Sequence, residues 1–469
     1  MRIGVGSPPK GVRGAGVSSV VNSLRTETWL TGRPDGTQAE RIISSWNWDT
    51  KRTTLHLRLR QDVYFHDGTK LTPEIAATAL RVSKDAEEAA SFASIRTVET
   101  RGSDGLEITV AEPNAFVVAD LALVSVRLPG KEDVGTGPFR TARTDPATQR
   151  VILEAFPQYY RGRPAVDEID ISTYPTQRNA WAALMRGEID MLYDVSRDAA
   201  EFVEAGTVVK TYAFPRPYYI PLVFNVRHPV LANREVRRAI NEALDKVTLV
   251  RDGMNDRGRP ADGPVWPEHW AHATPRAEIG FQPEAARARL DAAGLKIRPG
   301  TGGNMPSRFT FTCLVFANDE RFQRLAVLVQ KQLADVGIDM NLQPAKMDDL
   351  EKRAKAGEFD AFLFEMFGRS LTYAYDFWHS GDKGLSNSGY RAADDVLDRM
   401  RRAGSDEELR ATVAEFARIL NEDPPGAFIA WQTTMRAVSS KFDVAAEENR
   451  DIMTNAWQWR LATPAQSDR

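Results

Sequence analysis

Cysteine is almost absent from this 469-residue sequence, and having only Cys313 excludes an internal disulfide and any multi-cysteine metal or cluster site. Cys313 lies in the apolar run TFTCLVF, which favours a buried packing role over a catalytic thiol. No stretch approaches about 18 uncharged apolar residues, so the sequence predicts no membrane-spanning helix. The 61 basic and 64 acidic residues are mixed along the chain, and the net charge of −3 predicts neither a nucleic-acid-binding surface nor a polybasic membrane arm.

Motifs of the common enzyme classes are missing as well. The sequence contains no GxSxG elbow, no HExxH pair, no EF-hand loop and no kinase motif set. His269 and His272 are three residues apart in PVWPEHWAHATP, with no carboxylate cluster to support a metal, so we expect no metal site there. These absences favour binding over catalysis, and we expect neither an enzyme nor a bound cofactor.

What is present is a strand–turn–helix stretch near the middle of the chain, residues 214–246. Its aromatic and apolar run, Tyr218–Val226, is predicted to be a buried strand, because strands of α/β proteins are near-continuous apolar runs. Asn233 stands at the N-cap of the helix that follows. Apolar residues of this helix recur on one face: Val236, Ala239, Ile240, Ala243, Leu244 and Val247. We expect this stretch to carry the chain from one lobe into another, with residues 234–250 opening the second.

A repeated cassette on either side of this stretch indicates α/β architecture. A predicted helix over 177–185 is followed by GEID and a strand over 191–195, and a helix over 348–356 is followed by GEFD and a strand over 361–367. A βαβ unit, with a strand over 309–316, a helix over 321–336 and a strand over 338–342, lies between the two copies. Two α/β lobes are the economical interpretation.

The two ends of the chain add further elements. Alternating strands are predicted over 42–48, 53–59 and 106–110, and Thr72 is a suitable N-cap for a helix that begins at Pro73. The last third predicts helices over 392–402 and 406–421, then strands over 427–438 and 453–460.

Six segments occur in a familiar order: LRLRQDVYFHDGTKLTPEIAATAL, GTGPFR, YYRGRPAVDEI, GEID, LVFNVRHPVLANREVRRAINEAL and LADVGIDMNLQP. Together they resemble the family 5 extracellular solute-binding proteins, the peptide- and nickel-type substrate receptors of bacterial ABC importers. The resemblance runs from about Ile42 to Trp459 and so covers nearly the whole chain.

The resemblance implies a periplasmic binding protein-like fold, with two α/β lobes around a ligand cleft plus a smaller extra domain. Lobe I would comprise residues 1–25, 166–228 and 440–469; the extra domain 26–165; lobe II 229–439. Such a receptor is expected to be a monomer that closes by a hinge on a small-molecule or peptide ligand and presents it to the permease subunits of an ABC importer. It would work in the periplasm or outside the cell at the membrane, its export signal trimmed from this sequence.

The ligand site is where the sequence departs from the dipeptide branch of the family. That branch binds the peptide amine with an Asp shortly after a Gly-Trp pair; aligned on this chain, Phe367 falls at the Trp and Ser370 at the Asp, with Arg369 between them. A family Arg that meets the peptide carboxylate falls near Arg324. The two arginines would suit an anionic or carboxylate-bearing ligand, although a solvated loop cation is an equal interpretation of Arg369.

Further candidates for the cleft are aromatic or basic: Tyr218, Tyr219, Tyr373 or Tyr375, and Arg127. Aromatic rings stack on flat or apolar parts of a ligand and their hydroxyl groups fix its orientation. For Tyr218 an ordinary core position in a strand is an equal alternative. Nickel-type members place an Arg in the region of Arg127, but we do not expect nickel here.

One alternative function belongs to a different class. Without a visible export signal, the chain could be a cytoplasmic ligand-sensing regulator that reuses the same fold. No DNA-binding helix-turn-helix is evident at either end of the sequence, which argues against a regulator that binds DNA itself. A hydrolase is a distant third interpretation.

Overall fold

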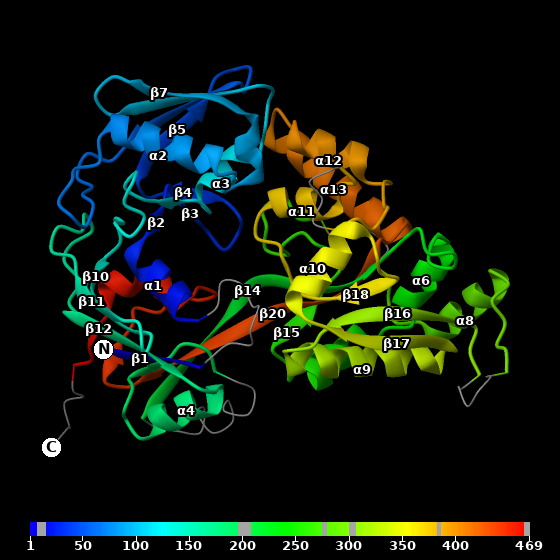
Figure 1. Ribbon diagram of the computed structural model, residues 1–469. Coiled ribbons are helices and arrows are strands. Elements are labelled where there is room, and N and C mark those ends of the chain that lie inside the picture. The colour runs from blue at the N-terminus through cyan, green and yellow to red at the C-terminus, as the bar shows by residue number, and fades with distance from the viewer. Residues whose placement is uncertain (7–15, 196–207, 274–278, 300–305, 382–385, 464–469) are drawn as a thin grey trace.

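A computed structural model of the chain describes residues 1–6, 16–195, 208–273, 279–299, 306–381 and 386–463. Its largest element is a mixed sheet that runs through most of the molecule (Figure 1). The strands of its main path are, in order, β10 (Phe139–Asp145), β11 (Arg150–Ala155), β12 (Glu168–Tyr174), β1 (Arg2–Gly6), β13 (Met191–Leu192), β20 (Gly426–Ser439), β14 (Val209–Phe224), β18 (Ala361–Leu363), β16 (Phe309–Phe316) and β17 (Ile338–Ala345). The described part contains no helix long and apolar enough to cross a membrane.

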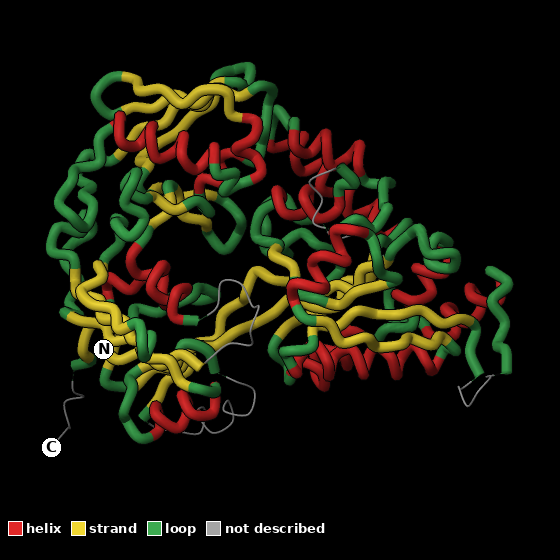
Figure 2. The backbone as a smooth tube through the Cα atoms, viewed as in Figure 1, coloured by secondary structure: helices red, strands yellow, loops and turns green. Residues whose placement is uncertain are grey.

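Two long antiparallel strands, β14 and β20, connect the two ends of this sheet (Figures 1 and 2). The predicted strand Tyr218–Val226 is confirmed as far as Phe224, but β14 begins nine residues earlier, at Val209. It continues through Pro217 because the register with β20 shifts between Arg216 and Tyr219, and a bulge tolerates a residue that cannot donate to the ladder. Pro215 stays in register, opposite Thr433.

The second lobe, defined here as β18, β16 and β17 with their helices, confirms the predicted βαβ unit: β16 and β17 are parallel and joined by α9 (Glu320–Asp335). Helices α9, α6 (Arg234–Glu242) and α8 (Pro283–Ala292) share one apolar core with the sheet, to which Met347 and Leu350 of α10 (Met347–Ala356) also belong (Figure 1). Three further helices, α11 (Leu371–Trp378), α12 (Asp394–Arg401) and α13 (Asp406–Glu422), pack beside them.

The helix predicted after Asn233 is confirmed over Arg234–Glu242, but its predicted extension to Val247 is wrong. The Asn233 side chain accepts a 2.9 Å hydrogen bond from the Glu235 N–H and so caps α6. The helix ends at Glu242, and Val247, expected on its buried face, is 65% exposed. Asp245 starts a new short helix, α7 (Lys246–Thr248), by accepting from the Thr248 N–H, and this changes the phase of the apolar pattern.

The first lobe, defined as β12, β1 and β13 with α1 (Val17–Arg25) and α4 (Gln177–Met185), contains the N-terminus. The strand predicted over 453–460 is wrong: residues Ile452–Gln458 form a 3-10 helix, and only Arg460–Leu461 are extended. Asp451 caps this helix by accepting from the Met453 N–H at 3.1 Å. Ile452, Met453, Ala456 and Trp459 are buried at helical spacing, which replaces the alternation of a strand.

The extra domain contains a separate four-stranded sheet in the order β5 (Ile43–Trp48), β6 (Thr54–Leu59), β8 (Gly105–Val110), β7 (Ile95–Arg101). Helix α2 (Pro73–Asp85) packs on it, capped as predicted by the Thr72 hydroxyl, which accepts from the Ile75 N–H at 3.4 Å. Strands β10 and β11, within the range 26–165 expected for this domain, pair with β12 in the large sheet.

Candidate functional site

Three half-buried aromatic side chains gather where β14 crosses between the lobes. The short strand β19 (Met366–Phe367) pairs with β14, with Phe367 opposite Tyr218. Their rings lie 5.1 Å apart edge to face, and the Tyr373 ring lies 4.6 Å from that of Phe367, also edge to face. Burial raises the pKa of Tyr373 to about 12, so this hydroxyl is neutral at physiological pH. The structure thus brings together three of the predicted site residues.

A buried ion pair adjoins the aromatic cluster. Arg216 donates two hydrogen bonds to the Glu365 carboxylate, at 2.7 and 3.1 Å, and its guanidinium lies 4.0 Å from the centre of the Tyr218 ring. Gln432 of β20 donates a further 2.7 Å bond to Glu365. Paired in this way, Glu365 compensates Arg216 and is not available as an anchor for a ligand amine.

The other charges near the crossing are paired too. Arg436 of β20 donates to Asp194 at 2.9 Å and to Asp451 at 2.8 Å, and it stacks on the Tyr193 ring at 3.7 Å. Arg321, at the start of α9, donates to the Asp319 carboxylate at 3.0 Å. Each of these carboxylates compensates an arginine of the same lobe or of the crossing strands.

Arg369 differs from these arginines. Its side chain is exposed, and its Nη2 donates a 3.1 Å hydrogen bond to the backbone carbonyl of Gly32 in the extra domain. Within the described residues it has no carboxylate at ion-pair distance. Its pKa is lowered, chiefly by desolvation from the surrounding protein and secondarily by the nearby Arg450. A cation that is partly desolvated but not neutralised favours the binding of an anion.

Ser370 serves a structural role in this conformation. Its hydroxyl caps α11 by accepting from the Thr372 N–H at 3.3 Å, and it lies 3.5 Å from the Asp120 carboxylate of the extra domain. Thr372 donates a stronger bond, 2.8 Å, to the same carboxylate. Burial raises the pKa of Asp120 to about 6 despite these bonds. Ser370, which the sequence comparison aligned with the amine-binding Asp of dipeptide receptors, is thus a buried helix cap.

The remaining predicted residues lie apart from the aromatic cluster or beneath it. Tyr219 is 1% exposed, and its hydroxyl accepts a 3.1 Å bond from the Trp378 indole, so the structure places it in the core. Arg127 pairs with Glu88 of the extra domain at 3.7 Å. Arg324 is exposed on α9 and makes no side-chain hydrogen bond or ion pair within the described part of the chain.

Reasoning from the sequence missed the Arg216–Glu365–Gln432 network. The available signal was a charged residue inside an apolar strand: Arg216 stands between two prolines in FPRPYY, and Glu365 interrupts the run AFLFEMF. Such charges are rarely buried without a partner. The sequence could indicate that partners exist, but it could not identify them, because Arg216 and Glu365 are 149 residues apart.

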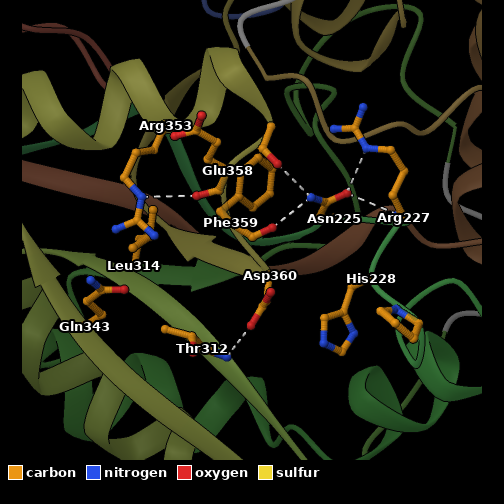
Figure 3. Close-up of a pocket in the computed structure, with 12 residues that line it drawn as sticks. Asn225, Arg227, His228, Thr312, Leu314, Gln343, Arg353, Glu358, Phe359 and Asp360 are labelled. Carbon is orange, nitrogen blue, oxygen red and sulfur yellow. Dashed lines mark hydrogen bonds between the residues drawn. The ribbon is translucent and has the colours of Figure 1, made fainter.

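A cavity of about 580 Å³ lies elsewhere, at the outer end of the second lobe (Figure 3). It is lined by Asn225, Arg227, His228, Pro229, Thr312, Leu314, Gln343, Arg353, Gly357, Glu358, Phe359 and Asp360. Asn225 follows β14, seven residues beyond Tyr218, which corresponds to roughly 23 Å of extended strand. The cavity is therefore separate from the aromatic cluster.

The sequence of the chain is similar to those of known bacterial binding proteins. A sequence model of the bacterial extracellular solute-binding proteins, family 5 (middle region), matches residues 39–387. The oligopeptide-binding protein AppA of Bacillus subtilis is 24% identical over 444 residues, which cover 87% of this chain and 80% of that protein. Heme-binding protein A of Haemophilus influenzae is 25% identical over 295 residues, covering 58% and 52% of the two chains.

Two solved structures show the same fold. NikA from Brucella suis, in complex with Fe(III)-EDTA, superposes with a TM-score of 0.86 at 18% identity and covers 98% of this chain and 100% of its own. AppA from Bacillus subtilis, in complex with a nonapeptide, superposes with a TM-score of 0.80 at 19% identity, and the match covers 99% of each chain. The predicted mixed α/β binding-protein fold is confirmed.

Proposed function

Because the chain belongs to the bacterial extracellular solute-binding proteins of family 5, a family of binding proteins rather than enzymes, we propose how it captures its solute for an ABC importer. The ligand binds between the two lobes, against the aromatic cluster of Tyr218, Phe367 and Tyr373. The protein acts as a monomer in the periplasm or at the outer surface of the membrane, and its partners are the importer's permease subunits. A cytoplasmic regulator is not favoured by these relatives.

Capture proceeds by hinge closure around the crossing strands. In our proposed division, lobe I comprises residues 1–25, 166–228 and 440–469, the extra domain residues 26–165, and lobe II residues 229–439. The bulge at 216–219 supports a hinge there, because a bulge interrupts the ladder of β14 and β20 where the lobes meet. Closure links the affinity for the ligand to the population of the closed state.

The ligand is a peptide-like or otherwise carboxylate-bearing solute. The observation that carries this proposal is the charge of Arg369, which no carboxylate of the described residues compensates, whereas Arg216, Arg321 and Arg436 are each paired with a carboxylate. Arg324 supplies a second exposed cation on α9. Tyr219, next to Tyr218 in the chain, fixes the position of this strand by packing its ring 5.0 Å from that of Trp431 in the core.

Native mass spectrometry of the purified protein tests this proposal directly. A closed receptor retains its ligand, so we expect an adduct whose exact mass and fragmentation reveal a carboxylate. Small-angle scattering with the identified ligand should then show a smaller radius of gyration. Absence of compaction with any ligand that raises the melting temperature would contradict hinge closure, and a ligand with no anionic group would contradict the role of Arg369.

A further inference from the structure

A rigid frame of hydrogen bonds holds open the cavity at the outer end of the second lobe (Figure 3). Asn225 is 7% exposed, and its Nδ2 donates to the carbonyls of Gly357 at 3.0 Å and Phe359 at 2.7 Å. Its Oδ1 accepts from the Arg227 N–H at 3.1 Å. One side-chain amide therefore joins the end of β14 to the turn between α10 and β18, so the cavity does not depend on a ligand for its shape.

Arg353 and Asp360 are oppositely charged residues of this lining that form no ion pair within the described residues. Arg353, half-buried on α10, donates only through Nε, to the Glu358 carbonyl at 3.1 Å, and Figure 3 shows its guanidinium directed toward Leu314. Asp360 accepts the Thr312 N–H at 2.9 Å through Oδ2. Among the described residues, no partner approaches the two terminal nitrogens of Arg353 or the other oxygen of Asp360.

Further polar groups complete the lining. The Nδ1 of His228 accepts from the N–H groups of Val230 and Leu231, both at 3.3 Å, which leaves Nε2 as the ring donor. Gln343 is exposed on β17 and adds an amide. Arg227 also lines the cavity, and its guanidinium donates to Asn225 at 3.3 Å and to Asn387 at 2.9 Å, while Glu358 adds an exposed carboxylate. The cavity thus offers cations, carboxylates and further polar groups within one volume, and Arg353 and Asp360 are the pair whose terminal atoms lack partners among the described residues.

We propose that this cavity is a second ligand site, specific for a small zwitterion of the amino-acid class. A carboxylate on Arg353 and an ammonium on Asp360 would satisfy both unpaired charges. An anion alone would leave Asp360 uncompensated, and a cation alone would leave Arg353 uncompensated. The volume of about 580 Å³ lies in the range typical of small-molecule sites. Because the site is roughly 23 Å along β14 from Tyr218, it is independent of the solute captured between the lobes.

Three probes of similar size separate the two charges: L-alanine, propionate and ethylamine. In saturation-transfer NMR and calorimetry on the full chain, we expect alanine to bind at least about tenfold more tightly than either single-charge probe, because each charged contact contributes on that order. Arg353→Gln and Asp360→Asn should each weaken alanine binding about tenfold. Lys352→Gln, an exposed neighbour on α10 that does not line the cavity, should leave it unchanged.

The controls separate this site from the cleft. Arg369→Gln removes the proposed anchor between the lobes and should not change alanine binding at the outer site. Asp360→Asn keeps an acceptor for the Thr312 N–H, so its melting temperature should match that of the parent protein. The proposal is overturned by equal binding of all three probes, by no alanine binding at roughly 10 mM, or by alanine affinity that responds to Arg369→Gln and not to Arg353→Gln.

Discussion

Arg369 and Gly32 lie 337 residues apart in the chain, and the guanidinium of the first donates a 3.1 Å hydrogen bond to the carbonyl of the second. Gly32 ends β3 (Leu30–Gly32), which forms a hairpin with β4 (Gln38–Glu40). The second lobe holds the same hairpin through the Trp266 indole, which donates to the Pro34 carbonyl at 3.0 Å. Arg369 therefore lies at a contact between the extra domain and the second lobe, where closure around a ligand would change its surroundings.

Replacing Arg369 tests its proposed role in binding. We expect Arg369→Gln to weaken binding of the solute identified in the purified protein by about 10- to 100-fold, because a lost hydrogen bond to a charged group costs about 1.5–3 kcal/mol. Arg324→Ala should also weaken binding. Calorimetry provides the measurement, and Arg96→Ala, an exposed arginine of β7, is the matched control. Unchanged affinity in Arg369→Gln would mean that this arginine is only a solvated loop cation.

Asp120 predicts a specific dependence of stability on pH. Its pKa is raised from 3.8 to about 6 by burial, so the folded state holds its proton more tightly than the unfolded state. The resulting stabilisation is complete below about pH 4 and is lost as the pH rises to about 6, a difference of about 3 kcal/mol in the free energy of unfolding.

Asp120→Asn should remove this component. Urea unfolding of both proteins at several pH values between about 4 and 7 measures the difference, and the gap should grow in favour of the variant as the pH rises, then become constant above about pH 6. Parallel curves for the two proteins would show that Asp120 does not titrate in this range.

The buried carboxylate of Glu27 connects Arg41 with the segment that contains Tyr159 and Tyr160. Its carboxylate accepts from Arg41 at 3.0 Å, from the Tyr159 hydroxyl at 2.9 Å and from the Tyr160 hydroxyl at 3.1 Å. Its side chain has 0% exposure. Glu27→Gln should lower the free energy of unfolding by about 3–5 kcal/mol, because it leaves the Arg41 charge without its partner in the protein interior.

An exposed ion pair, Glu154 with Arg140, provides the comparison for the Glu27→Gln result. Glu154 accepts from Arg140 at 2.8 Å, but both side chains are at least 40% exposed. Glu154→Gln should therefore cost less than about 1 kcal/mol. Chemical denaturation of the two variants side by side gives the comparison, and equal losses would refute a special role for the buried carboxylate.

Local patterns account for what the sequence predicted correctly. The cap at Asn233, the cap at Thr72 and helix 177–185 were all predicted, because caps and apolar periods are read within a few residues. The prediction extended the central helix to Val247, because its spacing still fitted the apolar face. The helix instead ends before Asp245, which caps a new short helix. A pattern read over a few residues does not show that the cap at Asp245 interrupts the helix begun at Asn233.

The site was harder to predict for a different reason. The aromatic positions Tyr218, Phe367 and Tyr373 were named from the sequence, and the structure brings them together. Their neighbours Arg216 and Glu365 were not, since their pairing depends on how two distant strands align. Arg321 and Arg324 differ by less than one helical turn, yet only Arg321 is held by Asp319, and this depends on the start of α9.

Gly368 provides the last test, because the backbone at this position lies close to two buried aromatic rings. A Cβ at this position would lie 2.4 Å from Cη2 of Trp431 and 3.0 Å from the Tyr219 ring. Both rings are almost fully buried and cannot move aside without disturbing their own packing. We therefore expect Gly368→Ala to lower the free energy of unfolding by about 1–3 kcal/mol, the usual cost of overpacking. Gly263→Ala is the control, since nothing lies within 4 Å of its added Cβ.

Because Gly368 joins Phe367 to Arg369, the Gly368→Ala variant should also weaken solute binding, whereas Gly263→Ala should not. Thermal unfolding and calorimetry measure the two effects, and a Gly368→Ala protein with unchanged stability would show that the aromatic core yields more readily than its burial implies.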